Sequence, residues 1–172
     1  MAKSFAGRRE TAHLRCELVS ILKPLAGFDD DLEENLESFA ALTGYPYEIV
    51  FGVSGLSDPA VAVARAFIAR HPEVLARVVI TDAYAADNPK VAQLIGLAEA
   101  ARGDVLVTSD SNVRVGPEYL RQLLAPLDDA RCGLVTSVFS GTGEKSLGAA
   151  LENLQLAAMI TPSVVLSTLS TP

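Results

Sequence analysis

The sequence predicts an α/β domain whose mostly parallel β-sheet is covered by helices. Short apolar runs of strand length alternate with longer stretches in which apolar residues recur at helical spacing. Helix-start pairs such as Asp58-Pro59 and Asn88-Pro89 separate the two kinds of segment. Strands that alternate with helices of this length are typical of a parallel sheet. The chain has 172 residues, of which 49% are hydrophobic, so it can bury one substantial core.

Five short apolar runs are the expected strands. They cover residues 16–22, 47–53, 77–81, 104–109 and 133–139. The first helix is expected between the acidic residues 29–31 and the turn Gly44-Tyr45-Pro46. The second begins at Asp58-Pro59, and its inner face comprises five apolar residues at helical spacing: Ala60, Val63, Ala64, Phe67 and Ile68.

The later helices follow the same pattern. Asn88 is the expected N-cap of the third helix, which ends before Gly103. Its buried face is expected to consist of the apolar residues Val91, Leu94, Ile95 and Ala98. A fourth helix is expected from Gly116-Pro117 to Leu127. A last helix presents apolar residues on one face: Leu147, Leu151, Leu154 and Ala158.

Charge and composition exclude several classes of protein. The net charge is −7 and the pI is about 4.8, so nucleic acid is not an expected partner. Residues 1–15 carry four basic residues and one acid, and we expect a basic flexible tail, or alternatively a stretch beside anionic lipid. Neither a signal peptide nor an apolar stretch long enough to span a bilayer is present. Cys16 and Cys132 lack metal-ligand spacing and are expected to be buried, reduced thiols.

Two carboxylates follow apolar runs and form the candidate site. Asp110 follows the run 105–108, and Asp58 follows the run 49–53. Ligands of open α/β sheets bind at the carboxyl ends of the strands, so both acids are expected at one crevice. Asp110 is the expected ligand of a divalent cation, and Lys90, in the first turn of a helix, is the expected contact of a phosphate. The pattern therefore favours a metal-bound nucleotide diphosphate and sugar transfer.

Each of these residues also has a structural interpretation. Asp110 can cap the turn that leads to Val113 and Gly116, and Asp58 can cap the helix that begins at Pro59. Lys90 can be a solvated lysine that the helix tolerates, although a cation at that end opposes the helix dipole. Residues 141–146 depart from a phosphate-binding loop, and no dinucleotide-binding glycine motif follows the first strand.

Six segments, in unbroken order, resemble the ceramide glucosyltransferase family. They are residues 19–27, 35–39, 45–48, 58–60, 88–90 and 110–115. Bacterial hopanoid-type lipid glycosyltransferases are similar through the same segments. The resemblance extends from about Leu18 to about Leu154, and the order of the motifs makes it more specific than any one of them.

The resemblance implies a GT-A fold that binds a UDP-sugar with Mn²⁺ or Mg²⁺. It implies an inverting glycosyltransferase that transfers the sugar to a lipid hydroxyl. Asp58 matches the family's first aspartate, near the uridine, and Asp110 the second, near the metal and the diphosphate. Lys90 matches the family's lysine after Asn-Pro. The chain departs from the family at Gln93, at Asn112 and around residues 160–162, where a histidine is missing.

The family continues to a third aspartate that is expected to act as general base, then to a Gln-x-x-Arg-Trp motif and membrane segments. This chain has no Trp. We therefore expect residues 16–172 to be one incomplete GT-A-like nucleotide-sugar-binding domain that ends in mid-domain and is inactive alone. The full-length protein is expected at the cytoplasmic face of a membrane. Apolar residues 147–169 are expected to self-associate or to bind lipid.

Two other functions remain open from the residues alone. One is a non-catalytic nucleotide-sugar-binding or interaction domain, which would bind UDP and metal without turnover. The other is a phosphoacceptor receiver domain, which also has an aspartate at a strand end. A receiver domain needs an acidic pair after its first strand, where this chain has Lys23-Pro24.

Overall fold

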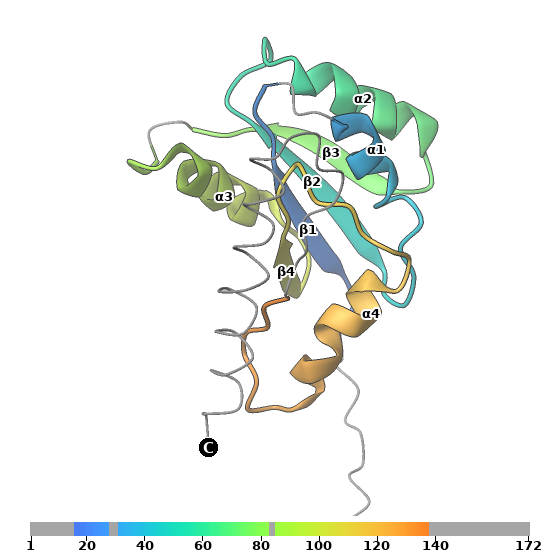
Figure 1. Ribbon diagram of the computed structural model, residues 1–172. Coiled ribbons are helices and arrows are strands. Elements are labelled where there is room, and N and C mark those ends of the chain that lie inside the picture. Colours follow the sequence, from blue (N-terminus) through green and yellow to red (C-terminus); the bar gives the residue numbers. More distant parts are fainter. Residues whose placement is uncertain (1–15, 28–30, 83–84, 138–172) are drawn as a thin grey trace, which may run out of the picture. The chain divides into compact units, whose positions relative to one another are not determined.

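Four parallel strands form the sheet at the centre of the protein (Figure 1). The computed structural model describes residues 16–27, 31–82 and 85–137. The strands are β1 (Val19–Pro24), β2 (Tyr47–Val53), β3 (Leu75–Ile80) and β4 (Val105–Thr108). Their spatial order is β3-β2-β1-β4, so β1 lies between β2 and β4. The predicted α/β class and the parallel sheet are confirmed.

Helices cover both faces of this sheet. Helix α3 (Pro89–Ala100) lies on one face, and α1 (Leu32–Glu37) and α2 (Ala60–Arg70) lie on the other (Figure 1). The face with α1 and α2 also receives α4 (Tyr119–Leu124), which continues into the 3-10 turn η1 (Ala125–Asp128). Strand residues alternate between the faces, as Ile21 and Leu22 show: Ile21 packs in the main core, and Leu22 packs with Leu97 of α3.

The main core lies on the α1 and α2 face. Val19 and Ile21 of β1 and alternate residues of β2 pack there with the buried residues of the helices. Phe51 of β2 meets Phe67 of α2 edge-on, with ring centroids 5.7 Å apart. Aromatic pairs in this geometry contribute about 0.5–1.5 kcal/mol beyond their area burial.

The face of α3 that packs on the sheet differs from the predicted one. Its buried residues are Ala92, Gln93 and Leu97, whereas Val91 and Ile95 are exposed. Two glycines explain the rotation, because they let the helix approach the sheet closely. A Cβ at Gly52 would lie 2.9 Å from Leu97, and one at Gly96 would lie 3.0 Å from Thr81.

Several element boundaries also differ from the prediction. β2 has the predicted bounds, but β1 begins at Val19 rather than at residue 16. Residues 133–137, the described part of the predicted fifth strand, form no strand. The predicted last helix and the basic residues 1–15 lie outside the described residues. Cys16 and Cys132 are only partly buried, so their predicted burial is incomplete.

The chain divides into two compact units, Met1–Cys132 and Gly133–Pro172. All the helices and strands described above belong to the first unit. Within the part of the chain that the structure describes, no helix combines the length and apolarity needed to cross a membrane.

Candidate functional site at the carboxyl edge of the sheet

The carboxyl ends of β2, β1 and β4 lie at the same edge of the sheet because the three strands are parallel neighbours. Both predicted residues are hydrogen-bonded to the segment that ends β1. Asp58 contacts Gly27, just after β1, and the main chain of Asp110 contacts Lys23, near the end of β1. The structure therefore brings Asp58 and Asp110 to one edge, on either side of β1.

Asp58 connects the loop after β1 to the start of α2. Its carboxylate accepts hydrogen bonds from the backbone N–H of Gly27, at 3.0 and 3.2 Å, and from that of Ala60 at 2.9 Å. Gly27 has a φ of 68°, a conformation that favours glycine. The N-cap of α2 is Pro59 rather than Asp58, so Asp58 stands one residue before the capping position and bonds the first N–H of the helix. Its role toward a nucleotide stays a prediction.

Asp110 presents its carboxylate outward from the end of β4. Its side chain is 52% exposed, and its Oδ1 lies 2.7 Å from the Nζ of Lys90. The turn that follows is closed by the main chain, since the Val113 N–H donates to the carbonyl of Asp110 at 3.3 Å. The hydrogen bond that closes this turn thus uses the carbonyl of Asp110, not its side chain.

Lys90 is held in position by the start of α3. The side chain of Asn88 accepts hydrogen bonds from the backbone N–H groups of Lys90 and Val91, which confirms Asn88 as the N-cap. A cation in the first turn opposes the helix dipole unless an anion is near. Asp110 is that anion here.

Lys23 lies beneath this pair and was not predicted as a site residue. Its side chain is fully buried, and its Nζ donates to the carbonyl of Asp110 at 2.8 Å and to the Ser109 hydroxyl at 3.2 Å. The ammonium also lies 3.9 Å from the ring centroid of Phe39. Burial lowers the pKa of Lys23 to about 7, although the nearby charge of Asp110 acts to raise it.

Gln93 joins α3 to the loops at this edge. Its amide donates to the carbonyl of Leu25 and to the hydroxyl of Ser54, both at 3.1 Å. Leu25 follows β1 and Ser54 follows β2, so one buried side chain fixes both strand ends. Gln93 therefore has a structural role at this edge.

The exposed carboxylate of Asp110 could hold a divalent cation if other ligands came from water or a phosphate. Within residues 16–27, 31–82 and 85–137, no three His, Cys, Asp or Glu side chains are grouped to hold a metal. Mg²⁺ in proteins is commonly bound by one or two carboxylates, with water and substrate phosphates as the other ligands. The Lys90 ammonium beside Asp110 shows that positive charge is accommodated at this carboxylate.

Comparison with known proteins identifies the family. The sequence model described as glycosyl transferase family 21 matches residues 2–170. The chain belongs to glycosyl transferase family 21. The predicted resemblance to ceramide glucosyltransferases is confirmed by this match and by the relatives described next.

Two members named ceramide glucosyltransferase illustrate the similarity. Ceramide glucosyltransferase 1 of Caenorhabditis elegans is 33% identical over 100 residues, which cover 58% of this chain and 22% of the relative. The ceramide glucosyltransferase of Komagataella phaffii is 38% identical over 104 residues, which cover 58% of this chain and 20% of the relative. The chain therefore spans about a fifth of the length of these family 21 relatives.

Solved structures share the fold. The mannosyltransferase PcManGT from Pyrobaculum calidifontis, in complex with GDP-Man and Mn²⁺, matches 69% of this chain and 34% of its own. The TM-score is 0.57 at 21% sequence identity. TarS of S. aureus matches 75% of this chain and 23% of its own, with a TM-score of 0.56 at 16% identity. These likenesses confirm the predicted GT-A fold of the family 21 chain.

Proposed function

We propose that this chain is the donor-binding part of a UDP-sugar-dependent lipid glycosyltransferase. The observation that carries the proposal is the exposed Asp110 carboxylate at the end of β4, paired with Lys90 at the start of α3. Membership of glycosyl transferase family 21 supports sugar transfer, and the names of the relatives support a lipid acceptor such as ceramide. The solved relative that holds GDP-Man and Mn²⁺ supports a nucleotide-sugar donor with a metal.

Three residues have distinct roles in the proposed donor site. Asp110 holds Mn²⁺ or Mg²⁺, which neutralises negative charge on the diphosphate leaving group. Lys90 exchanges Asp110 for a phosphate oxygen when the donor enters, because its long side chain is 54% exposed and a lysine stem is flexible. Asp58 orders the loop at Gly27, beside which the uridine binds.

The sugar is transferred to the lipid hydroxyl with inversion, and that step needs a general base at the hydroxyl. The base is proposed to lie outside the described residues, since the chain spans about a fifth of its relatives. We accordingly propose that the 172-residue chain binds donor without transferring sugar. In the full-length protein the domain works at the cytoplasmic face of a membrane, with residues 147–169 as the apolar contact surface.

Calorimetry with UDP tests the proposal. The 172-residue chain should bind UDP in the presence of Mn²⁺ and lose that binding in EDTA, because two carboxylates otherwise repel the diphosphate. Glu99→Gln, which neutralises an exposed acid near the other end of α3, is the matched control and should bind as the wild type does. Equal UDP affinity with Mn²⁺ and with EDTA would rule out the metal-dependent donor site.

A further inference from the structure

A lysine is buried at the carboxyl end of β1. Lys23 has no exposed surface, although it carries a long, ionisable side chain. It occupies an inward position of the strand, two residues after Ile21, and its ammonium lies against the ring of Phe39. Burying an amine is costly unless it finds hydrogen-bond partners, so the partners of this one indicate what it does.

The partners of Lys23 belong to the end of β4. Its Nζ donates to the Asp110 carbonyl at 2.8 Å and to the Ser109 hydroxyl at 3.2 Å. Among the described residues, no ion pair joins Lys23 to a carboxylate within 4.0 Å. The amine therefore binds the main chain of Asp110 instead of neutralising its side chain.

The Asp110 carbonyl has a second donor, the N–H of Val113, at 3.3 Å. The same carbonyl thus closes the turn of residues 110–113 and receives the lysine. Ser109, just before it, is fixed to β1 by a hydrogen bond from its N–H to the Leu22 carbonyl at 3.0 Å. Lys23 extends the contact between β1 and the β4 segment two residues beyond Thr108, as far as Asp110.

We propose that Lys23 is a positioning residue that fixes the turn of residues 110–113 and thereby directs the Asp110 carboxylate toward the donor. The Asp110 side chain is 52% exposed, and Lys90, with which it forms an ion pair, is 54% exposed. An exposed ion pair cannot by itself hold a carboxylate in one place. The buried lysine holds the carboxylate in place through the backbone, because its hydrogen bond to the Asp110 carbonyl restricts the main chain of Asp110.

The effect of Lys23 on donor binding rests on the proposed function, whereas its effect on the turn of residues 110–113 does not. A carboxylate that is held within a fraction of an ångström binds a metal–diphosphate better than a carboxylate that moves. Lys23 touches neither the proposed metal nor the donor. It acts through Asp110.

Hydrogen exchange of the ligand-free 172-residue chain tests the effect on the turn. In Lys23→Met the Val113 amide should exchange about tenfold faster, as expected when a buried hydrogen bond that fixes this carbonyl is removed. Amides of β1 and β2 should exchange as in the wild type. Ser109→Ala is the matched control, because it removes the other partner of the same ammonium and leaves the bond to Asp110.

Calorimetry with UDP and Mn²⁺ on the same variants tests the consequence. Lys23→Met should lower the affinity about tenfold, and Ser109→Ala should leave it within about twofold. Unchanged Val113 exchange in Lys23→Met, or a uniform increase at every amide, would overturn the positioning role. If the wild type binds no UDP while Lys23→Met still loosens the turn, the proposed function fails and the positioning role stands.

A second variant guards against loss of the fold. Lys23→Gln keeps a polar amide for Ser109 but is one bond shorter, so it should loosen the turn while the chain stays folded by circular dichroism. Faster Val113 exchange in Lys23→Gln supports the proposal. If both variants unfold, or if Lys23→Gln leaves Val113 exchange unchanged, Lys23 has a purely structural role.

Discussion

Asp58 has structural bonds at a position that the family resemblance assigns to donor binding. Its carboxylate accepts the N–H groups of Gly27 and Ala60 and so ties the end of β1 to the start of α2. A carboxylate has room for further hydrogen bonds, so these contacts are compatible with a nearby nucleotide. Two substitutions separate the structural role from donor binding. Asp58→Ala removes both acceptor oxygens, whereas Asp58→Asn keeps one of them.

Asp58→Ala should lower the free energy of unfolding by about 1–2 kcal/mol, since it removes a helix-start acceptor and leaves the Gly27 N–H without it. Asp58→Asn keeps one acceptor oxygen and should lose less than half of that. Urea titration measures both values. A loss for Asp58→Ala within about 0.3 kcal/mol of zero would show that these bonds contribute nothing.

Single residues were predictable where the signal is local. Asn88 was predicted as the N-cap of α3 from its place before Pro89, and the structure confirms it. Lys23 was not predicted, because its partners lie 86 and 87 residues further along the chain. The predicted strand also ended at residue 22, so Lys23 was placed after it, whereas β1 runs to Pro24.

Helix α3 shows why an element can be predicted while its orientation is not. Hydrophobicity alone favoured Val91 and Ile95 as buried, yet both are exposed. The orientation depends on Gly52 of β2, which lies far away in sequence and gives Leu97 room to pack. A helix can approach a sheet closely where glycine has no side chain in the way. A count of apolar residues does not detect such positions.

Gly52→Ala should therefore destabilise the chain by about 1–3 kcal/mol, because the new Cβ would overpack the buried Leu97. Thermal or urea unfolding measures the change. Gly116→Ala is the control, since nothing lies within 4 Å of a Cβ there. In the Leu97→Ala background the Gly52→Ala penalty should shrink, and a penalty that persists in full would contradict the packing explanation.

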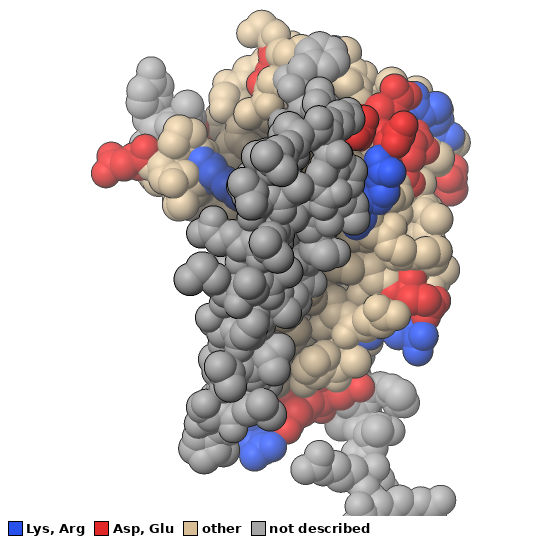
Figure 2. Space-filling view, in the orientation of Figure 1, with Lys and Arg blue, Asp and Glu red and all other residues tan. Residues whose placement is uncertain are grey.

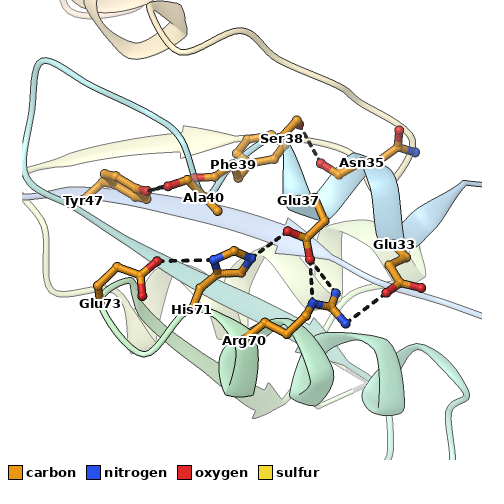
Figure 3. A network of polar contacts seen from close by, with 10 residues as sticks. All are labelled: Glu33, Asn35, Glu37, Ser38, Phe39, Ala40, Tyr47, Arg70, His71 and Glu73. Carbon is orange, nitrogen blue, oxygen red and sulfur yellow. Dashed lines mark hydrogen bonds and ion pairs between the residues drawn. The ribbon is translucent and has the colours of Figure 1, made fainter.

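Charged side chains join α1 to the end of α2. Acidic and basic residues gather over these helices in Figure 2. Figure 3 shows Glu37 of α1 between Arg70, at 2.5 Å, and His71, at 2.6 Å. Arg70 also pairs with Glu33 at 2.9 Å, and the other ring nitrogen of His71 lies 3.3 Å from Glu73. The hydrogen bond with Glu37 raises the pKa of His71 above its usual 6.5.

This pairing gives a pH dependence with a defined sign. A raised pKa means that His71 stabilises the fold fully below pH 6.5, and that this contribution is lost as the pH rises through the folded pKa. The His71→Asn penalty should be up to about 1 kcal/mol at about pH 6 and smaller at about pH 9. The free energy of unfolding of wild type and variant is measured with urea at each pH. The difference between the two values removes the contributions of other ionisable groups. An equal penalty at both pH values would contradict the ion pair.

At the scale of the whole molecule, the alternation of strands and helices was sufficient to predict the fold class. The run 47–53 coincides with β2, and Asp58 and Asp110 lie at the predicted edge. The order β3-β2-β1-β4 was not predicted, because strand length and apolarity do not specify which strands pair. The apolar run 133–139 was predicted as a strand, but its described part, 133–137, forms none.

The proposed function places Asp110 at the centre of the site, because it is the exposed carboxylate that Lys90 contacts at this edge. Loss of its charge should remove metal-dependent binding with little loss of stability, since a half-exposed side chain has few packing contacts. Asp110→Asn keeps the shape of the side chain without the charge and is therefore the sharpest variant.

The most direct test is calorimetric titration of UDP into wild type and Asp110→Asn, each with Mn²⁺ and with EDTA. We predict that the wild type binds only with Mn²⁺ and that Asp110→Asn, still folded, binds in neither condition. If Asp110→Asn binds UDP with Mn²⁺ as tightly as the wild type, Asp110 is not the metal ligand and the proposed donor site is wrong.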